Sequence, residues 1–88
     1  MELSAGDIVY SKAGRDKDKI FIVLEVLDNE YVLIADGILR GVQKPKKKKI
    51  KHLKKTNIKA ELVKRKFAKK EEVTNTDLKR LLAELENE

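Results

Sequence analysis

The sequence predicts one small, mainly β domain followed by a helical C-terminal segment, and three observations point to it. The chain has 88 residues, which is the length of a single domain. Its first half alternates short β-branched and aliphatic runs with polar turns, whereas its last third repeats apolar residues at helical spacing. We therefore expect a β domain over residues 1–57 and a helical segment over residues 58–88 that packs on it.

Three strands are expected in the first half of the chain. They cover residues 7–11, 20–27 and 31–35, and the segments between them contain the Gly, Asp and Asn residues typical of loops and turns. Asp36-Gly37, which follows the third strand, is the strongest hairpin signal in the sequence. This spacing favours an antiparallel meander.

The second strand predicts a sheet that is covered on both faces. A half-exposed strand would alternate apolar with polar residues, but here apolar residues fall on both sides of the pleat. They are Ile22, Leu24 and Val26 on one face, and Phe21, Val23 and Leu27 on the other. The interior of a small barrel would cover one face, and the C-terminal helices would cover the other.

The segment after Arg40 is rich in lysine and carries one further expected strand. Gly41 and Pro45 stand near its start, and a run of four lysines follows. A short edge strand is expected near Lys48 to Leu53, because edge strands tolerate Lys and a preceding Pro.

Two helices are expected after residue 57. Asn57 is the candidate N-cap of the first, whose apolar stripe is Ile58, Leu62, Val63 and Phe67. Thr74 and Asp77 resemble a capping box at the start of the second. The leucines of this second helix are Leu78, Leu81, Leu82 and Leu85. They would either cover the sheet or project from it and bind another protein.

The positive charge is concentrated in one segment. The chain has a net charge of +6, but residues 40–70 alone carry +14, and the segments on either side carry −4 each. Such a field attracts a polyanion: RNA, DNA or an acidic membrane surface. The alternatives are a solvated lysine-rich face without a partner and, for the run after Pro45, a nuclear localisation signal.

The composition leaves little for catalysis. Without cysteine and with a single histidine, the chain cannot build thiolate chemistry, a Cys-based metal site or a His-rich one. It also lacks a Gly-rich phosphate loop, so we expect no enzyme, no metal and no cofactor. The longest apolar run, Ile20 to Leu24, is far too short for a membrane helix. The first residues also give no expectation of a secretory signal.

Three separated segments resemble a known family. Residues 6–17 read GDIVYSKAGRDK and resemble a KOW motif, in which a loop with a nearly obligatory glycine, here Gly14, joins two strands. Residues 31–37 (YVLIADG), then Arg40, then the lysine run from Pro45 to Leu53 follow in the same order as in the L-fourteen-e family of large-subunit ribosomal proteins. The similarity is to its short bacterial type, because residues 58–88 do not resemble the long basic extension of the eukaryotic members.

The resemblance implies an SH3-like barrel that binds ribosomal RNA, as a component of the large subunit or a factor associated with it. It also implies a cytoplasmic, ribosome-associated protein. The alternative from another class is a protein-interaction module of the transcription or translation machinery, with the C-terminal leucines as its contact. The charge also permits duplex DNA binding, but no recognition helix with base-reading side chains is apparent.

Two groups of cations are the candidate RNA-binding residues, because affinity for RNA comes mainly from neutralising phosphates. One group lies in the glycine-containing loop, where Gly14 would bring backbone N–H groups close to a phosphate and Arg15 suits a bidentate contact. Asp16 and Asp18 could instead neutralise this loop internally. The other group is the lysine run with His52, which could stack on a base or be an ordinary strand residue. The full set is Lys12, Gly14, Arg15, Lys17, Lys19, Arg40, Lys44, Lys46, Lys47, Lys48, Lys49, Lys51, His52, Lys54 and Lys55.

The few aromatic residues argue against recognition of a single strand by stacking, which uses several exposed rings. The chain has only Tyr10, Phe21, Tyr31 and Phe67, and all stand in hydrophobic patterns that predict a place in the core. Folded RNA, recognised through its backbone and shape, is therefore the expected ligand.

Overall fold

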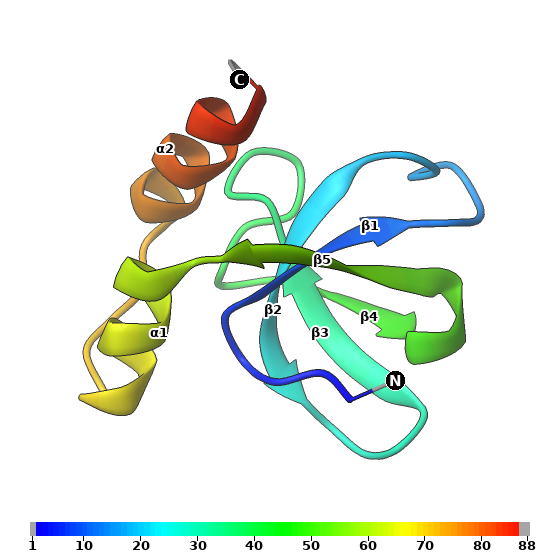
Figure 1. Ribbon diagram of the computed structural model, residues 1–88, viewed down its shortest axis with the longest axis horizontal. Helices are drawn as coiled ribbons and strands as arrows, with labels where there is room; N and C mark the ends of the chain where they lie inside the picture. The colour runs from blue at the N-terminus through cyan, green and yellow to red at the C-terminus, as the bar shows by residue number, and fades with distance from the viewer. Residues whose placement is uncertain (1, 87–88) are drawn as a thin grey trace.

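The computed structural model describes residues 2–86 as a five-stranded antiparallel sheet followed by two helices (Figure 1). The mainly β class with C-terminal helices is therefore confirmed, while Met1 and the last two residues of the predicted domains lie outside the described residues. The elements are β1 (Asp7–Ser11), β2 (Ile20–Val26), β3 (Tyr31–Ala35), β4 (Lys46–Lys49), the 3-10 helix η1 (Ile50–His52), β5 (Leu53–Lys59), α1 (Glu61–Ala68) and α2 (Asn75–Glu86).

The sheet has the strand order β4-β3-β2-β1-β5. The first four strands form the predicted meander, and β5 returns to pair with β1. β4 and β5 are thus the two edges of the sheet, yet only the three residues of η1 separate them in the chain. The sheet must therefore curl until its edges approach each other at η1, although within residues 2–86 no pairing between β4 and β5 closes it.

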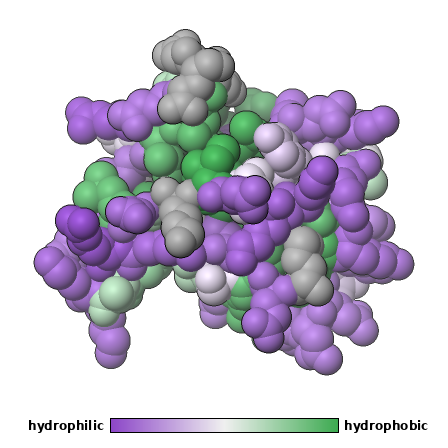
Figure 2. Space-filling view, in the orientation of Figure 1, coloured by the Kyte–Doolittle hydropathy of each residue, from purple (hydrophilic) through white to green (hydrophobic). Residues whose placement is uncertain are grey.

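Both faces of the sheet are covered, as the second strand predicted. Ile22 and Leu24 contribute to a cluster shared with both helices, whereas Phe21 and Val23 contribute to a second cluster enclosed by the curled sheet. In Figure 1 both helices lie on the same side of the sheet, and in Figure 2 hydrophobic residues are visible between α2 and the strands. The end of β2 departs from the pattern, because Val26 is exposed beyond a register shift.

The second helix docks on the sheet through its leucines. Leu78 and Leu82 are buried, and the other two, Leu81 and Leu85, pack against the same cluster. The capping box is confirmed: the Thr74 N–H donates to Asp77 Oδ2 (3.0 Å) and the Asp77 N–H donates to Thr74 Oγ1 (3.2 Å). For these leucines to bind another protein, α2 would have to leave the sheet.

The connection between β3 and β4 differs from the predicted hairpin. Instead of a two-residue turn at Asp36-Gly37, it runs over residues 36–45. Asp36 Oδ1 accepts from the N–H groups of Ile38 (2.8 Å) and Arg40 (3.0 Å), which closes a wider loop. Gly37 has φ +81°, and a Cβ there would lie 2.5 Å from the Asn75 carbonyl oxygen. The glycine therefore serves the close approach of α2 rather than a tight hairpin.

Two further boundaries were wrong. The edge strand expected near residues 48–53 is β4 at Lys46–Lys49, and the chain then turns through η1. The first helix begins at Glu61, because Asn57 and Ile58 belong to β5, and its expected stripe is broken by the exposed Leu62. The pairing of β5 with β1 satisfies backbone groups that the edge of β1 would otherwise leave open, and this tertiary contact outweighs the local helical pattern.

Asp7 is a buried carboxylate that links the strands to α1. Its Oδ1 accepts from Lys64 Nζ (2.8 Å), and its Oδ2 accepts from the Ser4 N–H (2.8 Å) and lies 3.6 Å from Lys55 Nζ. Burial by itself would raise the pKa of Asp7. The hydrogen bonds from Lys64 and Ser4, with the charges of Lys64 and Lys55, outweigh burial and lower the pKa below its ordinary value of 3.8.

We expect the free energy of unfolding to fall in acid as the pH passes down through the pKa of folded Asp7. The pKa of Asp7 is lower in the folded chain than in the unfolded one. The stabilisation from the Asp7 carboxylate is therefore complete above the unfolded pKa and is lost as the pH falls through the folded pKa. Asp7→Asn should lower the stability at neutral pH by about 2 kcal/mol and weaken this acid dependence. Urea unfolding from pH 7 down to pH 2 measures both effects. Asp18→Asn, which removes an exposed carboxylate, is the matched control. Wild-type stability and wild-type acid dependence in Asp7→Asn would contradict the expectation.

Candidate nucleic-acid interface

The run of four lysines in β4 divides into two functional halves, because successive side chains of a strand point to opposite faces. Lys46 and Lys48 are half-buried and point to the β1–β2 loop, residues 12–19. Lys46 forms an ion pair with Asp16, and Lys48 Nζ donates to the Ala13 carbonyl oxygen (3.2 Å). Lys47 and Lys49 are exposed. Half of the run therefore holds the loop, and only the other half is available to a ligand.

Part of the charge around the β1–β2 loop is neutralised within the protein, which was one of the two possibilities that Asp16 and Asp18 left open. Asp16 is buried, and the hydrogen bond from Lys46, followed by the charges of Lys46, Arg40 and Lys48, lowers its pKa despite the cost of burial. Asp18 is exposed and has φ +70°. Gly14 has φ +78° and lies at the exposed end of the loop. The loop is thus an ordered, ion-paired structure.

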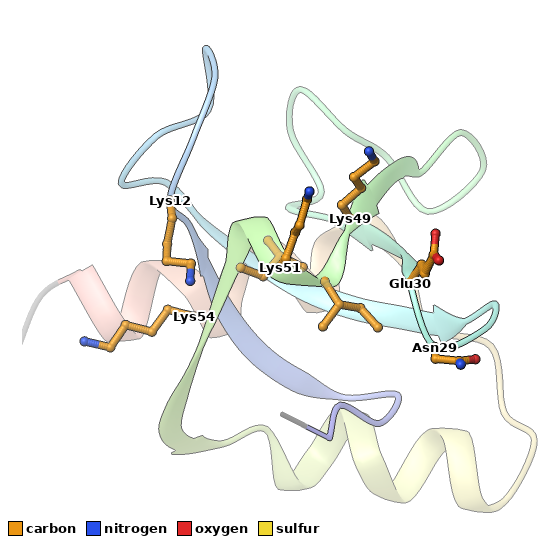
Figure 3. A pocket seen from close by; sticks show the side chains of 8 residues that line it. Lys12, Asn29, Glu30, Lys49, Lys51 and Lys54 are labelled. Carbon is orange, nitrogen blue, oxygen red and sulfur yellow. The ribbon is translucent and has the colours of Figure 1, made fainter.

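The 3-10 helix η1 joins three segments that are distant in the sequence. The Ile50 N–H donates to the Glu30 carbonyl oxygen in the β2–β3 turn (2.8 Å), and the Lys12 N–H donates to the His52 carbonyl oxygen (2.7 Å). Around η1 lies a hollow of about 860 Å³ (Figure 3). We call it the lysine hollow; it is lined by Lys12, Asn29, Glu30, Lys49, Ile50, Lys51, Leu53 and Lys54.

The lysines around η1 are close enough to His52 to affect its pKa. The pKa of His52 is lowered first by burial and then by the charges of Lys51, Lys48, Lys49 and Lys12. His52 is half-buried and is the only histidine of the chain. It belongs to η1 and not to a strand, and it is not among the residues that line the hollow.

The two tyrosines expected in the core are not fully buried, because Tyr10 is exposed and Tyr31 is half-buried. The ring of Tyr31 carries Lys47 Nζ at 4.4 Å from its centroid, which is a cation–π contact. Tyr10 is 37% exposed and lines a smaller hollow of about 350 Å³ with Lys12, Lys17 and Lys54. Phe21 is buried and Phe67 packs against the helical cluster. Tyr10 shares a face of β1 with Ile8, yet it belongs to neither cluster, and alternation alone could not show this.

The structure thus sorts the candidate cations by their surroundings. Lys12, Lys49, Lys51 and Lys54 meet in the lysine hollow, and Lys17 is next to it. Three others are bound within the protein: Lys46, Lys48 and Lys55. The remaining candidate cations are exposed and do not line the hollow: Arg15, Lys19, Arg40, Lys44 and Lys47.

Sequence reasoning missed the non-basic residues of the hollow, namely Asn29, Glu30, Ile50 and Leu53. Asn29 and Glu30 stand in a segment that was predicted only as a turn. Asp28 Oδ1 indeed closes that turn by accepting from the N–H groups of Glu30 and Tyr31 (2.8 Å each). No signal in the sequence indicates that this turn contacts η1, because the contact depends on the curl of the sheet.

No protein-family model matches the sequence, and no curated protein matches it either. In the part of the chain that the structure describes, no helix is long and apolar enough to cross a membrane. Residues 2–86 also contain no group of three or more His, Asp or Glu side chains placed to hold a metal ion. The interpretation of the site therefore rests on the geometry of the lysines.

Lys46→Gln should destabilise the protein, because it leaves the buried Asp16 carboxylate without its ion-pair partner. We expect a loss of about 1–2 kcal/mol, or a decrease in Tm of about 5–10 °C for a domain of this size. Lys47→Gln is the matched control, since Lys47 is exposed and its Nζ lies over the Tyr31 ring. Thermal unfolding followed by circular dichroism compares the two variants. An equal Tm in both would show that the ion pair does not hold the loop.

Proposed function

We propose that this protein binds structured RNA, with large-subunit ribosomal RNA as its ligand, through phosphate contacts made by the lysine hollow. The observation that carries the proposal is that Lys12, Lys49, Lys51 and Lys54 line one hollow around η1. Among residues 2–86, none of these four lysines forms a salt bridge with a carboxylate. Glu30 is the one carboxylate in the lining that they share, and a polyanion would relieve the mutual repulsion that remains.

The fold supports the same proposal. A curled five-stranded sheet, whose two edge strands are joined by a 3-10 turn, agrees with the SH3-like barrel that the resemblance implies. In that fold the β1–β2 loop is the KOW loop, and η1 stands beside its base through the Lys12 to His52 hydrogen bond. The resemblance to the L-fourteen-e family is the ground for naming ribosomal RNA.

The position of the cations favours RNA over duplex DNA. They lie on a loop, the two edge strands and a 3-10 turn, whereas a reader of the major groove presents base-contacting side chains on a helix or ribbon. Both helices of this protein pack on the sheet, with Val63 of α1 and Leu78 of α2 buried there. A-form RNA is recognised by shape and phosphate contacts, which suits a curved surface with spaced lysines.

Reversing two charges in the hollow should strongly weaken RNA binding without unfolding the protein. Lys49→Glu with Lys51→Glu changes two exposed side chains, so the stability should stay near that of the wild type. Lys79→Glu with Arg80→Glu, on the exposed side of α2, makes the same change of charge elsewhere. Fluorescence anisotropy with a labelled fragment of large-subunit ribosomal RNA compares their affinities. Equal loss in both variants would reduce the effect to net charge and contradict the proposed site.

The salt dependence of the same binding reaction counts the phosphate contacts. If the four lysines of the hollow each neutralise one phosphate, log K should fall against log salt with a slope of about −3. The variant with Lys49→Glu and Lys51→Glu should show a slope about one to two units shallower than the wild type. A slope near zero in the wild type would exclude phosphate neutralisation as the source of affinity.

His52 offers a direct report on occupation of the hollow. Neighbouring lysine charges help to lower its pKa, so an RNA phosphate that neutralises them should raise the pKa of His52. An NMR titration of the single histidine, with and without the RNA fragment, measures this change. An unchanged pKa in the complex would place the RNA away from η1.

A further inference from the structure

The lysine hollow contains one acidic residue, and its position is unexpected for a surface that binds only phosphates. Glu30 lies at the β2–β3 turn, and its backbone oxygen accepts from the Ile50 N–H (2.8 Å). Tyr31, the next residue, stands opposite Lys49 in the β3–β4 register. Figure 3 shows the side chains of Glu30, Lys49 and Lys51 extending to the same side of the ribbon. A carboxylate here repels any phosphate that the lysines attract.

The rest of the hollow is shaped for more than a phosphate chain. Ile50, which is half-buried, gives the lining an apolar part between the lysines, and Asn29 adds an amide beside Glu30. Leu53 lies beneath this surface in the inner cluster. Its volume of about 860 Å³ falls within the range of about 300–1,000 Å³ typical of small-ligand pockets. Apolar surface, a few polar groups and surrounding cations together match one nucleotide: a base, its sugar and the flanking phosphates.

We propose that the lysine hollow receives one unpaired nucleobase of a folded RNA and that Glu30 reads the exocyclic amino group of that base. A carboxylate only accepts hydrogen bonds, so it suits the N4 amino group of cytosine and disfavours uracil, which presents the O4 acceptor in the same place. The half-buried Ile50 contacts the base, and the lysines hold the phosphates on either side. Unpaired bases in loops and bulges are the usual targets of sequence-specific RNA recognition. This inference rests on the proposed function, because it assumes that RNA enters the hollow.

The test compares an RNA hairpin carrying one bulged cytidine with the same hairpin carrying one bulged uridine. We expect the wild-type protein to prefer the cytidine hairpin by about tenfold, which is the size of one good amino-to-carboxylate contact. Glu30→Ala should bind the uridine hairpin more tightly than the wild type does and should lose the preference. Its fold should persist, because the side chain is exposed and the bond to Ile50 comes from the backbone. Glu72→Ala, in the connection between α1 and α2, removes the same charge outside the hollow and should keep the preference.

The outcomes separate this inference from the function on which it rests. If the wild type binds both hairpins equally, and Glu30→Ala tightens both by the same factor, Glu30 is a general repulsive charge. That result overturns base reading and leaves RNA binding intact. If neither hairpin nor the ribosomal RNA fragment binds, the proposed function fails and this inference fails with it. A cytidine preference that persists in Glu30→Ala would assign the selection to another residue and contradict the role of Glu30.

Discussion

The short link between the two edge strands is the constraint on which the rest of the structure depends. β4 and β5 lie at opposite edges of the sheet, yet only the three residues of η1 connect them. A flat sheet of five strands would hold its edges about 19 Å apart, so the sheet has to curl. The curl encloses the inner cluster around Phe21 and Ile34. It also brings η1 against the β2–β3 turn and the base of the β1–β2 loop, which creates the lysine hollow.

The many lysines of this chain serve two different purposes. Some are structural, because buried carboxylates need partners: Asp7 holds Lys55 and Lys64, and Asp16 holds Lys46. These pairs neutralise two buried carboxylates with lysines of the basic segment. Among residues 2–86, the lysines that line the hollow form no such pair. Burial lowers the pKa of the neighbouring His52 most, and the charges of nearby lysines lower it further. The concentrated field is therefore a consequence of how the acids are distributed in the fold.

A polyanion-binding hollow with a carboxylate at its edge combines affinity with selection. Lysine contacts with phosphates give affinity that does not depend on sequence, whereas contacts with base edges give specificity. Here both would act within one hollow, with Lys49 and Lys51 on η1 and its flank, and Glu30 on the facing turn. The hydrogen bond from the Ile50 N–H to the Glu30 carbonyl oxygen fixes the position of η1 relative to the β2–β3 turn. This is the preorganisation that a selective site requires.

The local elements of this fold follow from the sequence, whereas their arrangement depends on tertiary contacts. β1, β3 and the capping box at Thr74 could be predicted, because alternation and capping depend on residues that are neighbours in the chain. β5 could not, since its pairing with β1 overrides the helical pattern around Ile58. The identity of the candidate cations could likewise be predicted from the sequence. The curl of the sheet decides which lysines bind carboxylates and which line the hollow with Glu30. These contacts join residues that are far apart in the chain, so they leave no periodic signal in the sequence.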